Sequence, residues 1–215
     1  MATSTYRVQQ FREIHLNTFR RIVSIAFVVG IQLLYLPTSE QTHGGVELIL
    51  PFDIFPIWPI WVSVYLSCFA LWIFGLTWAF FKFDDNLFRS FIIAFTFAGT
   101  IAAAIFVFFP TYVRPALIDG NNAFANLLRS VHQEYGRYDA FPSGHVYITT
   151  LMALFFSHLY PRTTKIWVTI VILVVLSTLF TGQHYIADAL GGLAVGFSGY
   201  HIGMWYAHWK PAVEN

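Results

Sequence analysis

His184 is followed four residues later by Asp188, the only Asp, Glu, Lys or Arg between Lys165 and Lys210. Residues four apart share one face of a helix, so the Asp188 carboxylate can contact the His184 ring. A carboxylate beside an imidazole fixes its tautomer and strengthens it as a base, and an acidic residue near a membrane span is a functional candidate. The spacing therefore predicts a reactive histidine. A helix-end histidine with an interfacial carboxylate would give the same pattern.

A second histidine, His145, ends the segment Phe-Pro-Ser-Gly-His over 141–145. Pro142 disfavours helix before it and Ser143 is a good N-cap, so a helix is expected to begin here. Backbone N–H groups at a helix start, together with the positive end of the helix dipole, bind phosphate well. Gly144 lets a ligand approach the backbone closely. The segment predicts a phosphate site beside His145; an ordinary capped helix is the alternative.

An arginine, Arg114, lies in the run Phe-Pro-Thr-Tyr-Val-Arg-Pro over 109–115. Its guanidinium can offer a planar fork of donors to a phosphoryl group, or it can extend to lipid head groups at the interface. Two histidines and one carboxylate would also suit a metal ion. An arginine close to a metal would be unfavourable, so we predict neither a metal nor another cofactor.

Apolar helices must position these residues. Hydrophobic residues make up 57% of the 215 residues, and charged residues make up 11%, against about 25% in soluble domains. Lipid must therefore cover part of the surface, and the net charge of +1 argues against a nucleic-acid partner. Because lipid-exposed backbone must satisfy its own hydrogen bonds, the apolar runs predict an all-α bundle of six transmembrane helices. These runs cover 20–36, 57–81, 90–109, 142–160, 165–183 and 184–208.

The distribution of positive charges predicts the orientation in the cell membrane. With six spans, the basic residues before the first span, between the second and third, between the fourth and fifth, and after the sixth fall on one side, so both termini are expected to be cytosolic. The chain then divides into a cytosolic segment 1–19, one catalytic transmembrane domain over 20–209, and a tail 210–215. The outer loop 110–141 breaks the charge rule, which a functional use of its arginines would explain. These are Arg114, Arg129 and Arg137.

A short amphipathic helix is expected over 121–135, on the outer membrane surface beside the site. Its apolar residues follow helical spacing: Phe124, Leu127, Leu128 and Val131. Asn121 or Asn122 can cap its start and Gly136 its end. In the last span, Gly192 and Gly196 form a small-xxx-small face that is typical of helix contacts inside a bundle.

Three segments together resemble the signature of the type 2 phosphatidic acid phosphatase and vanadium haloperoxidase superfamily. They are Arg114-Pro115, Pro142-Ser-Gly-His145, and Ser177 followed by His184 and Asp188. The resemblance implies a six-helix bundle and a metal-free mechanism through a phosphohistidine. In it, His184 is the nucleophile, Asp188 holds His184, and His145 is the general acid and base. Arg114, Ser143 and the Gly144 N–H bind the phosphate, with Ser177, Arg129 and Arg137 as auxiliary candidates.

Two positions depart from that signature, because Val107 stands where a lysine is usual and Thr178 stands where an arginine is usual. The three segments are closer to the branch that contains inositol phosphorylceramide and sphingomyelin synthases, which move a phosphorylated head group between lipids. A site with fewer cations suits a singly charged phosphodiester better than a dianion. Arg129, Arg137 or His132 could fold back and supply the missing charge.

The sequence therefore predicts a membrane enzyme that transfers a head group from a phosphodiester lipid to a lipid or alcohol acceptor. Three alternatives stay open at this point. The first is a lipid phosphate or polyprenyl diphosphate phosphatase, in which water is the acceptor. The second is a metalloenzyme, and the third is a non-catalytic protein that binds or transports a phosphorylated lipid. The sequence leaves the lipid, the acceptor and the oligomeric state open.

Overall fold

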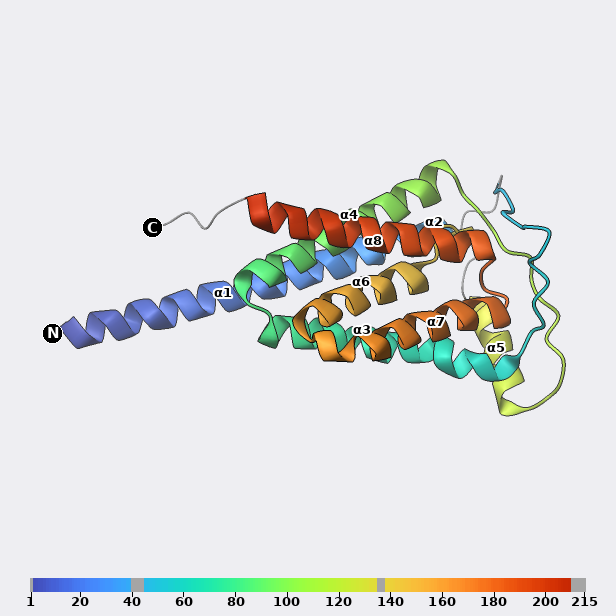
Figure 1. Ribbon diagram of the computed structural model, residues 1–215, viewed down its shortest axis with the longest axis horizontal. Helices are drawn as coiled ribbons and strands as arrows, with labels where there is room; N and C mark the ends of the chain where they lie inside the picture. Colours follow the sequence, from blue (N-terminus) through green and yellow to red (C-terminus); the bar gives the residue numbers. More distant parts are fainter. Residues whose placement is uncertain (1, 40–44, 135–137, 210–215) are drawn as a thin grey trace.

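The computed structural model describes residues 2–39, 45–134 and 138–209 (Figure 1). Two isolated β-bridges join Val46 and Asp139 to Thr111, and the described residues form no strand. The all-α class is therefore confirmed. The helices are α1 (Ala2–Gln32), α2 (Tyr35–Ser39), α3 (Val62–Lys82), α4 (Asp85–Phe108), α5 (Ala123–Glu134), α6 (Gly144–Leu159), α7 (Thr164–Phe180) and α8 (Ile186–Trp209), with 3-10 turns at Pro59–Trp61 and Pro161–Thr163.

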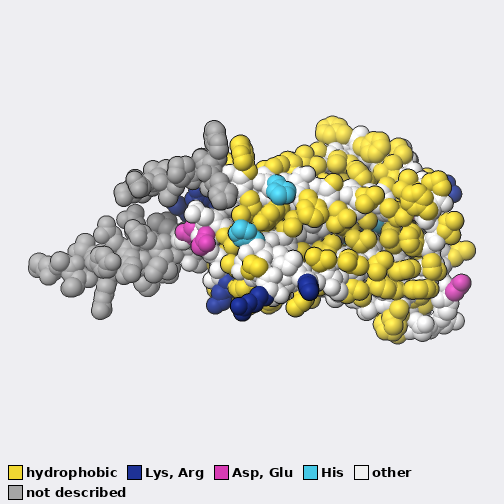
Figure 2. Space-filling model, viewed as in Figure 1, with side chains coloured by type: hydrophobic (Ala, Val, Ile, Leu, Met, Phe, Trp, Pro, Cys, Tyr) yellow, Lys and Arg dark blue, Asp and Glu magenta, His cyan; other side chains and the backbone are white. Residues whose placement is uncertain are grey.

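Four segments of the described chain are long and apolar enough to cross a membrane: Asn17–Pro37, Pro59–Lys82, Asp85–Phe108 and Pro161–Phe180. On the face drawn in Figure 2, hydrophobic side chains cover most of the described part of the bundle, and charged side chains lie towards its ends. The other two predicted spans correspond to α6 and α8. With 16 residues, α6 is about 24 Å long, short of the ~30 Å hydrocarbon core. Glycines and histidines lower the hydropathy of α8. The bundle is thus consistent with a membrane protein. That all six predicted spans cross the membrane stays a prediction.

Short connections make successive helices antiparallel. The chain passes from α3 to α4 and from α7 to α8 within a few residues, so the start of α8 lies beside the end of α7. In Figure 1 the two chain termini lie at one end of the bundle, and the starts of α6 and α8 lie at the other. The end of α4 also lies there, which brings the three candidate segments to one end of the molecule.

Glycines allow α8 to pack closely against α6 and α4. A Cβ at Gly196 would lie 2.8 Å from the Cβ of Thr150 in α6, and a Cβ at Gly203 would lie 2.3 Å from the Ser90 carbonyl oxygen in α4. Close contacts of this kind require glycine, so the helix-contact role predicted for Gly192 and Gly196 is confirmed. The stripe continues along the same face to Gly203, which meets α4 further along the helix.

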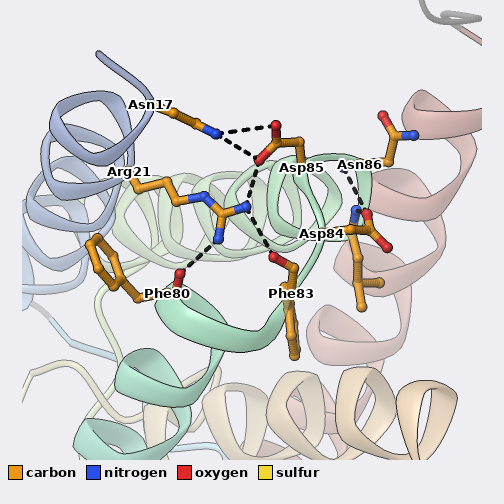
Figure 3. A network of polar contacts seen from close by, with 8 residues as sticks. Asn17, Arg21, Phe80, Phe83, Asp84, Asp85 and Asn86 are labelled. Atoms are coloured by element: carbon orange, nitrogen blue, oxygen red, sulfur yellow. Dashed lines mark hydrogen bonds and ion pairs between the residues drawn. The ribbon is translucent and has the colours of Figure 1, made fainter. Parts of the chain in front are cut away.

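A polar network attaches α1 to the hairpin between α3 and α4 (Figure 3). The Arg21 guanidinium donates hydrogen bonds to the carbonyl oxygens of Phe80 at 2.7 Å and Phe83 at 3.0 Å, and it pairs with the Asp85 carboxylate at 2.5 Å. The same guanidinium lies 4.6 Å from the centre of the Phe88 ring. Since an arginine in this position satisfies free carbonyls at the end of α3, the network fixes where α1 packs.

The helix expected over 121–135 is present as α5, and Asn122 caps it by accepting a hydrogen bond from the Ala125 N–H at 2.9 Å. Leu128 and Val131 are buried against Val62 and Tyr65 at the start of α3. The proposed end cap, Gly136, lies outside the described residues. Whether α5 lies on a membrane surface stays a prediction.

Candidate active site

His184 and Asp188 lie at the junction of α7 and α8. After α7 the chain turns at Gly182, whose φ of 66° favours glycine, and the His184 N–H donates to the Thr178 carbonyl at 3.2 Å. The Nδ1 atom of His184 then lies 3.5 Å from Oδ2 of Asp188. The side chains of the two residues are only 9% and 1% exposed. The expected pair therefore forms, but the two residues do not share a helix face as predicted, because His184 precedes the start of α8 at Ile186.

Asp188 also closes the start of α8. Its Oδ2 accepts a hydrogen bond from the backbone N–H of Tyr185 at 2.8 Å, as in one half of a capping box. The next free N–H, that of Ile186, donates to Oδ1 of Asp53 at 2.9 Å. The helix start is thus held from both sides, and the Asp188 carboxylate cannot rotate away from His184 without loss of its cap. Asp53 was not predicted to take part.

His145 lies in the first turn of α6, against aromatic residues of α3. Its ring stacks on Tyr65 with 3.9 Å between centroids and lies 5.1 Å from the Trp72 ring. The His145 and His184 ring centroids are 6.5 Å apart. In a productive geometry, reacting atoms lie about 3–3.5 Å apart, so one phosphoryl group can contact both rings. Among the described residues, the buried Nε2 of His145 has no hydrogen-bond partner.

Ser143 occupies the N-cap position of α6, but its side chain makes no capping hydrogen bond, which corrects the capping role expected for it. Its N–H donates to the Asp188 carbonyl oxygen at 3.0 Å, while its buried Oγ has no partner in the described part of the chain. A Cβ at Gly144 would meet only a ring carbon of Tyr147, at 3.9 Å. The space beside Gly144 is therefore open to a ligand, as the sequence predicted.

Arg114 follows α4 and pairs with an acidic residue that sequence reasoning did not connect to it. Its Nη2 lies 2.8 Å from Oε2 of Glu47, and the two side chains are 73% and 9% exposed. The other Glu47 oxygen accepts a hydrogen bond from the Tyr185 hydroxyl at 2.5 Å. This contact connects Arg114 to the start of α8. The only sequence signal was an acidic first loop, which does not specify a partner.

Asp139 lies in the same region, where it helps to line a cavity described below, and sequence reasoning missed it. It is half-buried beside the extended segment at Thr111, whose carbonyl and hydroxyl oxygens accept the Ala140 and Phe141 N–H groups at 3.1 and 2.7 Å. Loss of water around the carboxyl raises the pKa of Asp139 to about 6, while the charge of His184 acts in the opposite direction. It is the only acidic residue in 135–187, which was a usable signal.

Of the residues predicted to assist phosphate binding, some lie away from the cavity and one lines it. Arg129 donates to the carbonyl oxygens of Ile118 and Gly120, at 3.3 and 2.7 Å, and holds the loop before α5. Ser177 donates to the Val174 carbonyl within its own helix at 2.8 Å. Neither lines the cavity described below, and Arg137 lies outside the described residues. His132 does line it, with Nε2 2.8 Å from the Thr181 carbonyl oxygen.

Four of the predicted site residues line one cavity of about 350 Å³, whereas Ser143 and Asp188 do not line it. Those that line it are Arg114, Gly144, His145 and His184, joined by His132 and Asp139. Among the described side chains, no group of three or more His, Cys, Asp or Glu is arranged to hold a metal ion. The arrangement places the imidazoles of His145 and His184 and the guanidinium of Arg114 around one cavity.

A family model described as the PAP2 superfamily matches residues 59–202, which is more than half of the chain, and the protein belongs to this superfamily. Membership indicates a lipid phosphatase-type enzyme. The matched range contains Arg114, His145, His184 and Asp188. No curated protein and no solved structure matches the chain.

Proposed function

We propose that this protein transfers a phosphorylated head group from a phosphodiester lipid to a hydroxyl acceptor, through a phosphohistidine at His184. The charge of the cavity carries the proposal. Among the described residues, Arg114 is the only Lys or Arg that lines it, and Glu47 lies 2.8 Å from that guanidinium. Asp139 adds a further carboxyl group. A dianion held with so little positive charge would be costly, whereas a diester carries one negative charge.

In the first step, the His184 ring attacks phosphorus, a P–N bond forms, and the P–O bond to the leaving alcohol breaks. His145 gives its proton to the departing oxygen. A bound phosphate anion favours the imidazolium form of His145 that this requires. Asp188, 3.5 Å from Nδ1 of His184, stabilises the positive charge that develops on the ring.

In the second step, an acceptor hydroxyl attacks the phosphorus of the phosphohistidine. His145 removes the hydroxyl proton, the P–N bond breaks, and His184 is released. Arg114, the Ser143 hydroxyl and the Gly144 N–H hold the non-bridging oxygens in both steps. The buried Oγ of Ser143 supports this role, because a buried hydroxyl without a partner in the described residues is costly until a ligand binds it.

The surroundings of His145 favour a lipid or polyol acceptor over water. Tyr65, Phe69 and Trp72 surround its ring at 3.9 to 5.6 Å. Aromatic surfaces give ordered water few hydrogen-bond partners. Hydrolysis of the phosphohistidine would therefore be slow compared with attack by an acceptor that is held in the cavity.

The experiment uses purified full-length protein and a phosphodiester lipid labelled in its head group, with and without ceramide, diacylglycerol or inositol. A new labelled phospholipid that depends on the acceptor supports transfer, and acid-labile label on the protein supports the phosphohistidine. His184→Ala should abolish both. Full activity in this variant would remove the mechanism, and intact lipid after long incubation with wild-type protein would favour a binding or transport protein instead.

A second candidate function, hydrolysis of a phosphomonoester lipid, is favoured by one observation. His132 lines the cavity and, if protonated, would add the positive charge that the Val107 and Thr178 positions lack. In that case phosphatidic acid or a polyprenyl diphosphate releases free phosphate, and His132→Ala weakens this activity more than it weakens transfer. Equal loss of both activities would argue against a special role for His132.

The orientation is part of the proposal: both termini in the cytosol and the cavity on the non-cytosolic face of the cell membrane. The positive charges flanking the helices support it. A membrane-impermeant thiol reagent tests it on intact cells, with single cysteines at Leu117 or Arg162 in a Cys68→Ala background. Labelling at 117 but not at 162 is expected, and the opposite result would reverse the orientation.

A further inference from the structure

The cavity extends well beyond the two histidines into the apolar part of the bundle. The extension is lined by Val29 of α1, by Leu33 directly after that helix, by Ile73 and Leu76 of α3, and by Met152 of α6. Met152 lies seven residues after His145, about 10 Å further along α6 at 1.5 Å per residue. Leu33 is 48% exposed and Ile73 is 67% exposed, so the cavity opens on the side of the bundle between α1 and α3.

A hydrogen-bonded polar pair interrupts this apolar extension. The Tyr147 hydroxyl donates to Oε1 of Gln32, and Nε2 of Gln32 donates to the Phe95 carbonyl oxygen at 3.2 Å. Gly99 makes room for the amide, because a Cβ there would lie 2.6 Å from Nε2 of Gln32. Both Gln32 and Tyr147 line the cavity. The Gln32 amide is therefore fixed by two hydrogen bonds, packs against Gly99, and lies at the cavity wall.

The pair keeps hydrogen-bonding capacity for a ligand. A tyrosine oxygen that donates once can still accept, and an amide offers two N–H groups and two lone pairs. Burying such groups in an apolar cavity is unfavourable unless each finds partners. Two apolar side chains would fill the same space without that cost. Gln32 lies on α1, outside the 59–202 range that the family model matches.

We propose that this extension binds the backbone and one hydrocarbon chain of the lipid substrate, and that Gln32 and Tyr147 hydrogen-bond to a backbone ester, amide or hydroxyl group. The inference rests on the proposed function, because the phosphate of the same lipid lies at the histidines. Continuity of one cavity from His184 to Met152 identifies the occupant: a molecule with a phosphate at one end and hydrocarbon at the other. Glycerol- or sphingoid-based phospholipids meet this description, whereas a polyprenyl phosphate offers no backbone group to the pair.

The first arm of the experiment tests the hydrocarbon chain. Binding of a phosphatidylcholine with brominated chains is followed by quenching of tryptophan fluorescence, since Trp72 lines the cavity. The full-length protein carries His184→Ala, so that no lipid is consumed. Val29→Phe should weaken binding about tenfold or more, because overfilling a packed site is unfavourable. Val23→Phe on the same helix is the matched control, since Val23 is 49% exposed and does not line the cavity.

If Val29→Phe prevents folding, Leu76→Phe fills the cavity from α3 and is expected to have the same effect. Binding equal to that of the Val23→Phe control, in a folded variant, would overturn the proposal.

The second arm tests the polar pair with lipids of equal head group and chain length: a diester phosphatidylcholine, its diether analogue, and sphingomyelin. The diester and the sphingolipid should bind about 3- to 10-fold more tightly than the diether, as expected for one or two neutral hydrogen bonds. The double variant Gln32→Leu, Tyr147→Phe should remove this difference. Replacing both partners leaves no unpaired polar group, so the fold should tolerate it. An unchanged preference in the double variant would refute recognition by the pair.

The two proposals fail separately. Binding in the His184→Ala background needs no turnover, so a preference that depends on Gln32 and Tyr147 would stand even if the wild-type protein transferred nothing. Conversely, transfer activity in wild-type protein with no effect of the cavity variants would leave the proposed function intact and remove only this inference.

Discussion

A Cβ atom at Gly192 would lie 2.8 Å from the carbonyl oxygen of Ser143. Glycine is therefore what allows the backbone of α8 to touch the residue before α6. Through the same contact, the Ser143 N–H reaches the Asp188 carbonyl at 3.0 Å. The two segments that carry His145 and His184 are joined here by backbone, and their ring separation of 6.5 Å depends on this close approach.

Gly192→Ala is expected to lower kcat by about tenfold or more while the protein stays folded. The added methyl pushes α8 away from α6, and displacements of about 1 Å between reacting groups can cost about 100-fold in rate. Activity and the midpoint of thermal unfolding in detergent are measured together. Gly30→Ala is the control, because a Cβ at Gly30 meets nothing within 4 Å. Equal activity of the two variants would contradict the role of this contact.

Asp188→Asn should reduce kcat by about 10² to 10⁴, because a neutral amide neither fixes the His184 tautomer nor stabilises its positive charge. The amide oxygen can still accept the Tyr185 N–H, so the thermal midpoint should change little. Asp188→Ala removes this cap as well and should lower the stability by about 1 kcal/mol more. If the Asp188→Asn and Asp188→Ala variants both keep a kcat near that of the wild type and lower the thermal midpoint equally, Asp188 is only a helix cap.

Arg114→Ala is expected to lower kcat/KM by about 100-fold through loss of a charged donor to the phosphate. Arg114→Lys should restore only part of the lost kcat/KM, since an ammonium lacks the planar pair of donors that a guanidinium offers to a phosphate. Glu47→Gln weakens the 2.8 Å ion pair and leaves the guanidinium to the substrate, so KM should fall. Steady-state kinetics of the three variants tests this. A Glu47→Gln effect that persists in the Arg114→Ala background would mean that Glu47 acts elsewhere.

Asp139→Asn should change the pH dependence of stability. Burial raises the pKa of Asp139 from 3.8 to about 6 in the folded protein, so folding favours the protonated form. Its stabilising contribution is present below about pH 4 and is lost as the pH rises through 6. The wild-type thermal midpoint should therefore fall relative to Asp139→Asn between pH 4.5 and pH 7.5. Parallel curves for the two proteins would show that the carboxyl is not buried as described.

Local sequence patterns determined the helices and the contacts within them. Charge-free runs predicted α3 and α4, and the four-residue spacing predicted that His184 and Asp188 would meet. The shared helix face expected for this pair is wrong, because His184 precedes α8 and the contact spans the start of that helix. The start of α6 after Pro142 followed from local backbone preferences. Residue type alone also made Arg114 a candidate for phosphate binding. These predictions needed no knowledge of which helices are neighbours.

Only the tertiary structure decided which distant groups became partners. Glu47 meets Arg114, Asp53 caps α8, and Gln32 meets Tyr147 across 115 positions. No periodicity relates such residues, because their contacts depend on how α1 and the outer loops pack on the bundle. The same reason explains why Arg129, a plausible phosphate ligand by type, holds a loop instead. Contacts between residues close in the chain can be predicted from sequence, whereas a cavity lined by six helices exists only once those helices have packed.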